Sequence, residues 1–328
     1  MVTSPDLLAE VVRGDLVESV HHGHLVVLGA DGATLAEVGD ADAAMWPRSS
    51  LKPLQAVAML RCGLDADVDA LALAAASHSG TDAHLAVVRA VLERAGLGPD
   101  ALQNTPDLPL DADAAYAWRA AGHGPAALTQ NCSGKHAAML ATCVAAGWDT
   151  ATYLAPDHPL QRAIRSTVGE LTGVPVEHVT VDGCGAPLLS TTVRGLARAL
   201  GRIARAGAGA GDGDEARVAR AMAARPDLVG GPGRDVTAVM RAVPGLVAKD
   251  GAEGVYAAGL PDGTGIAFKV ADGSPRPRPA VLVAAVALAL RAAGQEVPAA
   301  LEAAGRTPVL GHGVPVGEVR TAFAGVAR

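Results

Sequence analysis

The sequence is poor in aromatic residues and has no excess of positive charge. Aromatic side chains make up only 2% of the 328 residues, which leaves few rings to stack on bases or to line a flavin or haem pocket. Lys and Arg total 27 against 34 Asp and Glu, for a formal net charge of −7. Since polyanions bind to basic surfaces, we do not expect generic nucleic-acid binding.

Long hydrophobic runs and a secretory leader are also missing. The first residues lack a charged region followed by an apolar stretch, which predicts a cytoplasmic protein. The longest strongly apolar run, residues 280–290, is shorter than the roughly 20 residues that span a bilayer, and it predicts a buried helix. Four cysteines are too few for a disulfide scaffold, so we expect free thiols available for metal or redox chemistry.

Apolar residues are nevertheless abundant enough to build a large core. Hydrophobic residues make up 50% of the chain and charged residues 19%, which excludes an extended disordered protein. We therefore predict a single compact domain over residues 1–328, with a division into two lobes as the alternative. The stretch 206–214, rich in Gly and Ala, predicts a flexible surface loop.

Hydrophobic periodicity indicates strands at both ends of the chain and helices between them. Apolar and polar residues alternate over 16–28, and Asp31-Gly32 provides a turn before 35–38. Three-and-four spacing predicts helices over 50–61 and 82–95. Strand-like runs return in the C-terminal third, at 245–248, 255–258 and 265–270. We expect an α/β (α+β) sandwich, in which a mixed antiparallel sheet is built from both chain ends and the middle region is helical.

A serine and a lysine stand three residues apart near residue 50. Ser49-x-x-Lys52 puts a hydroxyl and an amine on one face of a helical first turn, and Pro53 places the helix start at about Ser49 or Ser50. A serine at an electropositive helix N-terminus beside a lysine is a candidate nucleophile, because the lysine can serve as its base. Simple helix capping is the alternative interpretation.

Hydroxyl and imidazole groups gather in a second segment. Ser77, His78 and Ser79 follow a run rich in Ala and Leu and precede a predicted helix, so we expect a loop to present them. Capping of the following helix is again the alternative.

Two cysteines lie in polar or glycine-rich surroundings. Cys132 belongs to the polar segment 130–136, and glycines on both sides of Cys184 predict a thiol exposed on a tight turn. The two sulfurs could share a soft metal such as zinc, with Lys135, His136 or water completing four ligands. A phosphate-binding loop is excluded for this segment because residue 129 is threonine where that motif requires glycine.

A further lysine, Lys249, ends a predicted strand and precedes a glycine-rich turn. A lysine at such a place accompanies the S-x-x-K element in serine β-lactamases and penicillin-binding proteins. The chain contains no H-E-x-x-H, no G-x-S-x-G and no G-x-G-x-x-G that opens a helix, which argues against the common zinc protease, α/β-hydrolase and dinucleotide-binding sites.

Taken in order, these segments resemble the rhizobial-type L-asparaginases, also called the thermolabile, class 3 or asparaginase II family. The resemblance covers about residues 10–272 and implies a fold similar to that of serine β-lactamases and glutaminases. It also implies a homodimer that hydrolyses L-asparagine to L-aspartate and ammonia. The segments that carry it are 48–53, 77–80, 131–136, 182–187 and 249–254.

The resemblance assigns catalytic roles to two Ser-Lys pairs. Ser49 and Lys52 would form the first pair, with the Ser49 hydroxyl as the nucleophile. Ser77 and Lys249 would form the second pair. The alternatives for this second pair are Ser79 and Lys269.

It further implies one zinc ion per subunit, bound by Cys132, Lys135 and Cys184 with water in the fourth place. We favour a positioning and structural role for the zinc over activation of water, because the Ser-Lys pair already supplies a nucleophile. Arg48 would bind the substrate carboxylate, and Asp182 would orient the zinc site or a ligand amine. The residues assigned to substrate binding are Arg48, Ser79, His136 and Asp182.

Two other functions remain open at this point. The first is a β-lactam-recognising serine hydrolase, which predicts an exported protein, so the missing leader counts against it. The second is a non-enzymatic zinc-thiolate sensor that uses Cys132 and Cys184, with the serines as helix caps. The favoured partner is a small-molecule amide, L-asparagine, with its preference over glutamine undecided. We expect neither a nucleic-acid nor a membrane partner.

Overall fold

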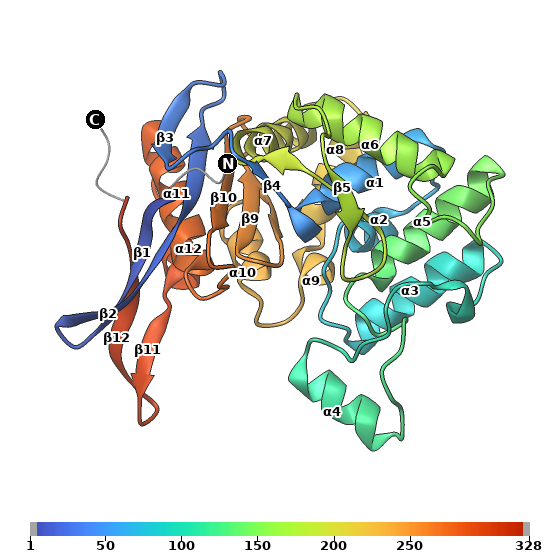
Figure 1. Cartoon of the computed structure of the whole chain (residues 1–328), viewed down its shortest axis with the longest axis horizontal. Coiled ribbons are helices and arrows are strands. Elements are labelled where there is room, and N and C mark those ends of the chain that lie inside the picture. Colours follow the sequence, from blue (N-terminus) through green and yellow to red (C-terminus); the bar gives the residue numbers. More distant parts are fainter. Residues whose placement is uncertain (1–4, 324–328) are drawn as a thin grey trace.

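The computed structural model describes residues 5–323, and its largest sheet joins the two ends of the chain (Figure 1). The strand order is β11-β12-β1-β2-β10-β9-β8, with β3 paired to β2, and every pair is antiparallel. The predicted antiparallel sheet from both chain ends is therefore confirmed. Its strands are β1 Asp6–Arg13, β2 Leu16–Leu28, β3 Thr34–Val38, β8 Val247–Asp250, β9 Val255–Gly259, β10 Gly265–Val270, β11 Pro308–Gly311 and β12 Val314–Thr321.

The predicted strand segments all lie in this sheet, but it contains three more. The runs at 16–28 and 35–38 form β2 and β3, and the three C-terminal runs form β8, β9 and β10. The sequence analysis did not anticipate β1, β11 and β12. Strands β1 and β12 pair with each other across the full length of the chain, with Val11 opposite Val319.

A helical region connects the two halves of the sheet, and the predicted helices are found with small changes at their ends. The segment 82–95 forms α3, and 50–61 begins as the short 3-10 helix η1 before it continues as α1. The bounds are η1 Arg48–Leu51, α1 Lys52–Arg61, α2 Val68–Ala74, α3 Asp82–Arg94, η2 Pro99–Ala101, α4 Ala112–Ala120, α5 Ser133–Ala146, α6 Pro159–Thr172, α7 Val193–Ala208, α8 Asp214–Ala224, α9 Pro226–Val229 and α10 Asp235–Ala242.

Short strands and two C-terminal helices complete the fold. Strand β4 (Ala44–Met45) pairs with β7 (Thr191–Thr192), and β5 (Val179–Val181) pairs with β6 (Pro187–Leu189). The apolar run at 280–290 forms the buried part of α11 (Arg278–Ala292), and α12 (Ala299–Gly305) follows it. No helix in residues 5–323 has the length and apolar character needed to cross a membrane.

The loop predicted at 206–214 is shorter than the sequence suggested. Helix α7 continues to Ala208 and α8 begins at Asp214, so the connection covers only 209–213. Arg220 of α8 donates hydrogen bonds to the carbonyl oxygens of Gly207, Gly209 and Gly211, which ties this connection to the helix.

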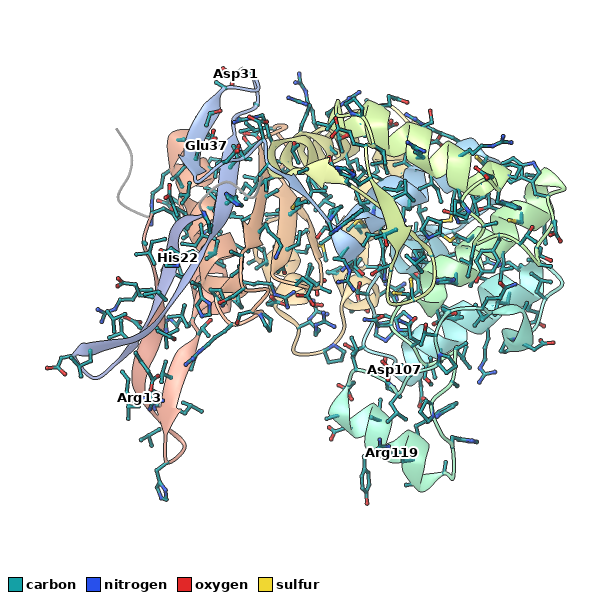
Figure 2. The ribbon with its side chains drawn as sticks, viewed as in Figure 1. Arg13, His22, Asp31, Glu37, Asp107 and Arg119 are labelled. Atoms are coloured by element: carbon teal, nitrogen blue, oxygen red, sulfur yellow. The ribbon has the colours of Figure 1, made fainter. Side chains whose placement is uncertain are left out.

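Two projections leave the body of the molecule on the same side of the view. Arg13 lies on the long β1–β2 hairpin and Arg119 on α4, and both appear at the lower edge of Figure 2. None of the residues of α4 is buried. The body itself holds one continuous cluster of buried apolar residues that includes both sheet and helix residues, such as Val26 and Val57.

The sheet and helix α7 approach each other closely because glycines line the contact. Helix α7 packs on β2, β9 and β10. A Cβ atom added to Gly259 would lie 2.1 Å from the Leu200 carbonyl oxygen, and one added to Gly265 would lie 2.1 Å from the Ala197 carbonyl oxygen. These neighbours are backbone atoms, which cannot rotate out of the way.

We predict that Gly259→Ala lowers the free energy of unfolding by about 3 kcal/mol, because the added methyl group forces α7 away from the sheet. Chemical denaturation followed by circular dichroism measures this change. Gly211→Ala is the matched control, since nothing lies within 4 Å of a Cβ at that position. If Gly259→Ala and the control had the same free energy of unfolding, the close contact between α7 and β9 would not require glycine at position 259.

Candidate active site

The Ser49 segment forms a tight turn between β4 and α1. Arg48 adopts a left-handed backbone conformation with φ of 52°, and the 3-10 helix η1 starts at this residue. Helix α1 follows from Lys52 with Pro53 in its first turn, so the start predicted at Ser49 or Ser50 falls inside η1, ahead of the α-helix itself. Ser49 is half-buried, whereas Ser50 is fully buried and donates a hydrogen bond to the Lys249 carbonyl oxygen at 3.2 Å.

Lys52 lies at the centre of the candidate site. Its side chain is 1% exposed, and its Nζ donates to the Ala76 carbonyl oxygen at 2.6 Å, to Ser77 Oγ at 3.0 Å and to Cys132 Sγ at 3.1 Å. The fold thus brings together three of the segments that the sequence singled out. Lys52 hydrogen-bonds to the hydroxyl of Ser77, not to that of Ser49. The contact therefore joins the lysine of the first predicted pair to the serine of the second.

Lys249 lies at the end of β8 and is completely buried. Its Nζ donates to the carbonyl oxygen of Asp250 at 2.7 Å and to Oδ1 of the same residue at 2.5 Å. Burial lowers the pKa of Lys249, the Asp250 carboxylate raises it, and the nearby Lys52 cation lowers it further, to about 8. Lys249 is therefore a buried amine that changes charge just above neutral pH.

The two cysteines lie close to each other, but the prediction of exposed thiols is wrong. Cys132 is 4% exposed and Cys184 is 2% exposed, because Leu154 and Ala186 pack against them. The glycines beside Cys184 make a turn, yet that turn points the thiol inward. Lys135 Nζ lies 3.2 Å from Cys184 Sγ.

Charge around the thiols favours a thiolate at Cys132. A hydrogen bond from Cys184 lowers the pKa of Cys132 well below its ordinary value, and the Lys52 and Lys135 cations act in the same direction against burial. The same contact with Cys132, together with burial, raises the pKa of Cys184. Burial alone would lower the pKa of Lys135, but both sulfurs hold it above its ordinary value.

The donor set at this place fits a zinc ion with three protein ligands. Residues 5–323 contain no group of three or more His, Cys, Asp and Glu side chains that could hold a metal. A set built on Cys132 and Cys184 would take the Lys135 amine as its third donor, and the Lys135 nitrogen lies beside the Cys184 sulfur. Thiolates and a neutral amine are suitable zinc ligands, and binding there would displace protons from these groups.

The residues assigned to substrate binding have different surroundings. Arg48 donates from Nε to Asp182 Oδ1 at 2.7 Å, so these two form an ion pair. Burial raises the pKa of Asp182, but the Lys135 and Arg48 cations and the Gly183 amide more than offset this and lower it.

Ser79 and His136 have partners inside the protein. Ser79 donates to the Gly230 carbonyl oxygen at 3.0 Å, and His136 is fully buried with its Nδ1 2.7 Å from the Tyr153 hydroxyl. Lys269 donates to the carbonyl oxygens of Glu253 and Val270, both at 2.6 Å. The hydrogen bonds described for residues 5–323 join Ser77 to Lys52 and Lys249 to Asp250, and none joins Ser77 directly to Lys249. The members of the second pair and the roles of Ser79 and His136 therefore stay predictions.

A cavity borders the site at Arg48. It has a volume of about 760 Å³ and is lined by Trp46, His178 and Lys269 as well as Arg48. A larger cavity of about 1130 Å³ lies between α11, α12 and β12 and contains none of the predicted site residues. Of these two cavities, the smaller one is lined by a residue of the Ser49 turn, Arg48.

Two charged residues at the site were missed by the sequence analysis. Asp250 contacts Lys249, and Arg234 donates to Asp250 at 2.7 Å. The composition could have drawn attention to the lysines near these two residues. The chain has only four, Lys52, Lys135, Lys249 and Lys269, and its other strongly basic residues are arginines. Three of these four lysines are almost completely buried at the site.

Comparison with known proteins gives a family for this chain. The family model of L-asparaginase II matches residues 9–321. A comparison with curated proteins finds no match. Among solved structures, Mglu in its native form is 15% identical over 84% of this chain and 65% of its own, with a TM-score of 0.45. A β-lactamase from Mycobacterium bovis is 14% identical over 86% of this chain and 93% of its own, with a TM-score of 0.35. These TM-scores are low, and the family assignment depends on the family model alone.

Buried lysine amines beside serine hydroxyls in an α+β fold define a class of serine hydrolases that use lysine for proton transfer. The family match makes the assignment narrower. The chain belongs to the L-asparaginase II family and is an amidohydrolase of the asparaginase type.

We predict that Lys249 titrates with a midpoint near pH 8, and that Lys52→Met raises this midpoint by removing a neighbouring positive charge. Selective labelling of the lysine Cε atoms with ¹³C gives four NMR signals, and Lys249→Arg assigns the relevant one. A midpoint at the ordinary lysine value of about 10.4 in the unmodified protein would contradict the prediction.

Proposed function

We propose that the protein hydrolyses the side-chain amide of L-asparagine to L-aspartate and ammonia. The observation that carries this proposal is the buried Lys52 amine, 3.0 Å from the Ser77 hydroxyl and one helical turn from the half-exposed Ser49. The match to the L-asparaginase II family supports the substrate. An amide has a poor leaving group, so its cleavage needs a nucleophile with a base and an acid for departing ammonia.

Ser49 is the better candidate for the nucleophile because a substrate can reach it. Ser49 is half-exposed, whereas Ser77 is 4% exposed and in contact with Lys52. In the first step the Ser49 oxygen bonds to the amide carbon and its proton passes to the Lys52 amine, which acts as the base once it has released its own proton to solvent. The C–N bond then breaks, and the Lys249 ammonium donates the proton that leaves with ammonia. Water then attacks the resulting serine ester and gives its proton to the now neutral Lys249 amine. The Lys52 ammonium returns its proton to the Ser49 oxygen, so L-aspartate leaves and both lysines regain their starting state.

Arg48 and Asp182 suit the two charged groups that every free amino acid carries. Arg48 and Asp182 pair through Nε and Oδ1. The guanidinium has further N–H groups for an α-carboxylate, and the carboxylate has a second oxygen for an α-ammonium group. An uncharged amide would gain nothing from this pair. The pair thus favours an amino acid amide over a simple carboxamide.

We infer that Cys132, Lys135 and Cys184 hold a zinc ion. The convergence of two sulfurs and one amine supports this inference. A zinc ion bound there would supply a positive charge for positioning the substrate and a crosslink between segments. The homodimer and the cytoplasmic location implied by the sequence remain predictions.

We expect Ser49→Ala to reduce ammonia release from L-asparagine by at least about three orders of magnitude while the protein stays folded, because the nucleophile is lost. An ammonia assay with L-asparagine and L-glutamine in parallel measures this. Ser166→Ala is the matched control, since Ser166 is exposed on α6. Full activity of Ser49→Ala would contradict the assignment, and no release by the unmodified protein from either amide would contradict the function.

We also predict that the purified protein contains one zinc ion per chain and that Cys184→Ser loses it, since a hydroxyl is a much poorer zinc ligand than a thiolate. Elemental analysis by mass spectrometry gives the stoichiometry. Cys62→Ser is the matched control because Cys62 lies at the end of α1 and is half-buried. Retention of zinc by Cys184→Ser would exclude this ligand set.

A further inference from the structure

The carboxylate of Asp250 connects charged groups from several elements. Asp250 is the last residue of β8 and is 6% exposed. Its Oδ1 accepts from Lys249 Nζ at 2.5 Å and its Oδ2 accepts from Arg234 Nη2 at 2.7 Å. Arg278 of α11 lies 4.0 Å from the same Oδ2. Each carboxylate oxygen thus has a cationic partner, and the side chain is buried, so Asp250 acts on its neighbours rather than on a substrate.

Arg234 extends this contact to the serine of the second pair. Its Nη2 binds Asp250, and its Nη1 donates to the Ser77 carbonyl oxygen at 3.4 Å. Arg234 directly precedes α10, so a single guanidinium joins the end of β8 to the Ser77 segment.

A second contact joins β8 to the turn that carries Ser49. The Ser50 hydroxyl donates to the Lys249 carbonyl oxygen at 3.2 Å. The backbone of Lys249 is thus fixed on the side of Ser49, and its amine is fixed by Asp250. Without the carboxylate, the long side chain of Lys249 would have only the Asp250 carbonyl oxygen as a hydrogen-bond acceptor among its described contacts.

We propose that the buried Asp250–Arg234 ion pair positions the second Ser-Lys pair. Asp250 orients the Lys249 amine and keeps it charged, and Arg234 ties the backbone of the Ser77 segment to Asp250. This inference rests on the proposed function, in which Lys249 donates a proton. Asp250 and Arg234 are positioning residues, because they act through Lys249 and Ser77.

The charges around Lys249 give the two partners opposite effects on its proton affinity. The groups that face it are Asp250 on its own strand, Lys52 from α1 and Arg234 from the segment before α10, with Arg278 of α11 reaching Asp250. Removal of the Asp250 carboxylate favours the neutral amine of Lys249, and removal of the Arg234 guanidinium favours its ammonium form. A purely structural role would not produce shifts of opposite sign.

The test compares Asp250→Asn and Arg234→Gln with the unmodified protein, using kcat, KM and the pH dependence of ammonia release from L-asparagine. We expect Asp250→Asn to lower kcat by about 100-fold, a typical loss for disturbed proton transfer, with a smaller change in KM. The midpoint of the alkaline decline in its activity should lie at a lower pH than in the unmodified protein, because Lys249 loses its proton more easily without the carboxylate. Arg234→Gln should lower kcat less and move the same alkaline decline to a higher pH.

Two further variants serve as controls. Asp250→Glu keeps the charge, so it should recover part of the kcat and the alkaline limb of the unmodified protein. Glu18→Gln breaks an ion pair of 2.8 Å with Arg13 on the exposed hairpin, and we expect it to change neither kcat nor the pH profile.

The outcomes separate this inference from the proposed function. An Asp250→Asn protein that is folded and keeps the kcat and pH profile of the unmodified protein overturns the inference, as do alkaline shifts of the same sign in both variants. If Asp250→Asn fails to fold, the direction of the shift in the more exposed Arg234→Gln decides. If the unmodified protein releases no ammonia, the proposed function fails, while the ¹³C titration of Lys249 in the two variants still supports or overturns the positioning role.

Discussion

The burial of three lysine amines in one polar cluster is the constraint on which this site depends. Lys52, Lys135 and Lys249 are each 2% exposed or less. A buried ammonium costs several kcal/mol unless partners compensate for the lost water. Each amine has its own compensation: oxygens and a sulfur for Lys52, sulfur for Lys135 and a carboxylate for Lys249. These partners come from distant segments, so the cluster can exist only in the complete fold.

The scaffold supplies these partners from the ends of its elements. Lys249 and Asp250 end a strand, Lys52 begins a helix, and Cys132 directly precedes another. Close packing of α7 on the sheet at Gly259 and Gly265 places β8, β9 and β10 where the end of β8 meets the Ser49 turn. The ion pairs on the surface contribute little to this arrangement, since exposed pairs are worth about 0–1 kcal/mol each.

Different surroundings give the lysines different chemistry. Lys249 is paired with a carboxylate, whereas Lys52 has neutral oxygens and a sulfur around it. When two side chains of the same type lie in different environments, their pKa values differ, and one can serve as the acid of a reaction while the other serves as the base. The Arg48–Asp182 pair beside them adds one charge of each sign, which matches the charges of an amino acid rather than those of a simple amide.

From the amino-acid sequence we could predict the antiparallel sheet from both chain ends, the helical middle, a helix start near Ser49, and several of the segments that meet at the candidate site. These features depend on hydrophobic periodicity and on turn residues within short stretches of sequence, so they can be predicted without knowing the tertiary structure. The sequence did not reveal β1, β11 and β12, the inward direction of the Cys184 thiol, or the contact of Lys52 with Ser77 instead of Ser49. It also did not indicate Asp250 and Arg234, which stand 16 residues apart and look like ordinary surface charges. Only the tertiary structure decided these points, because burial and pairing depend on which distant segments a side chain meets after folding.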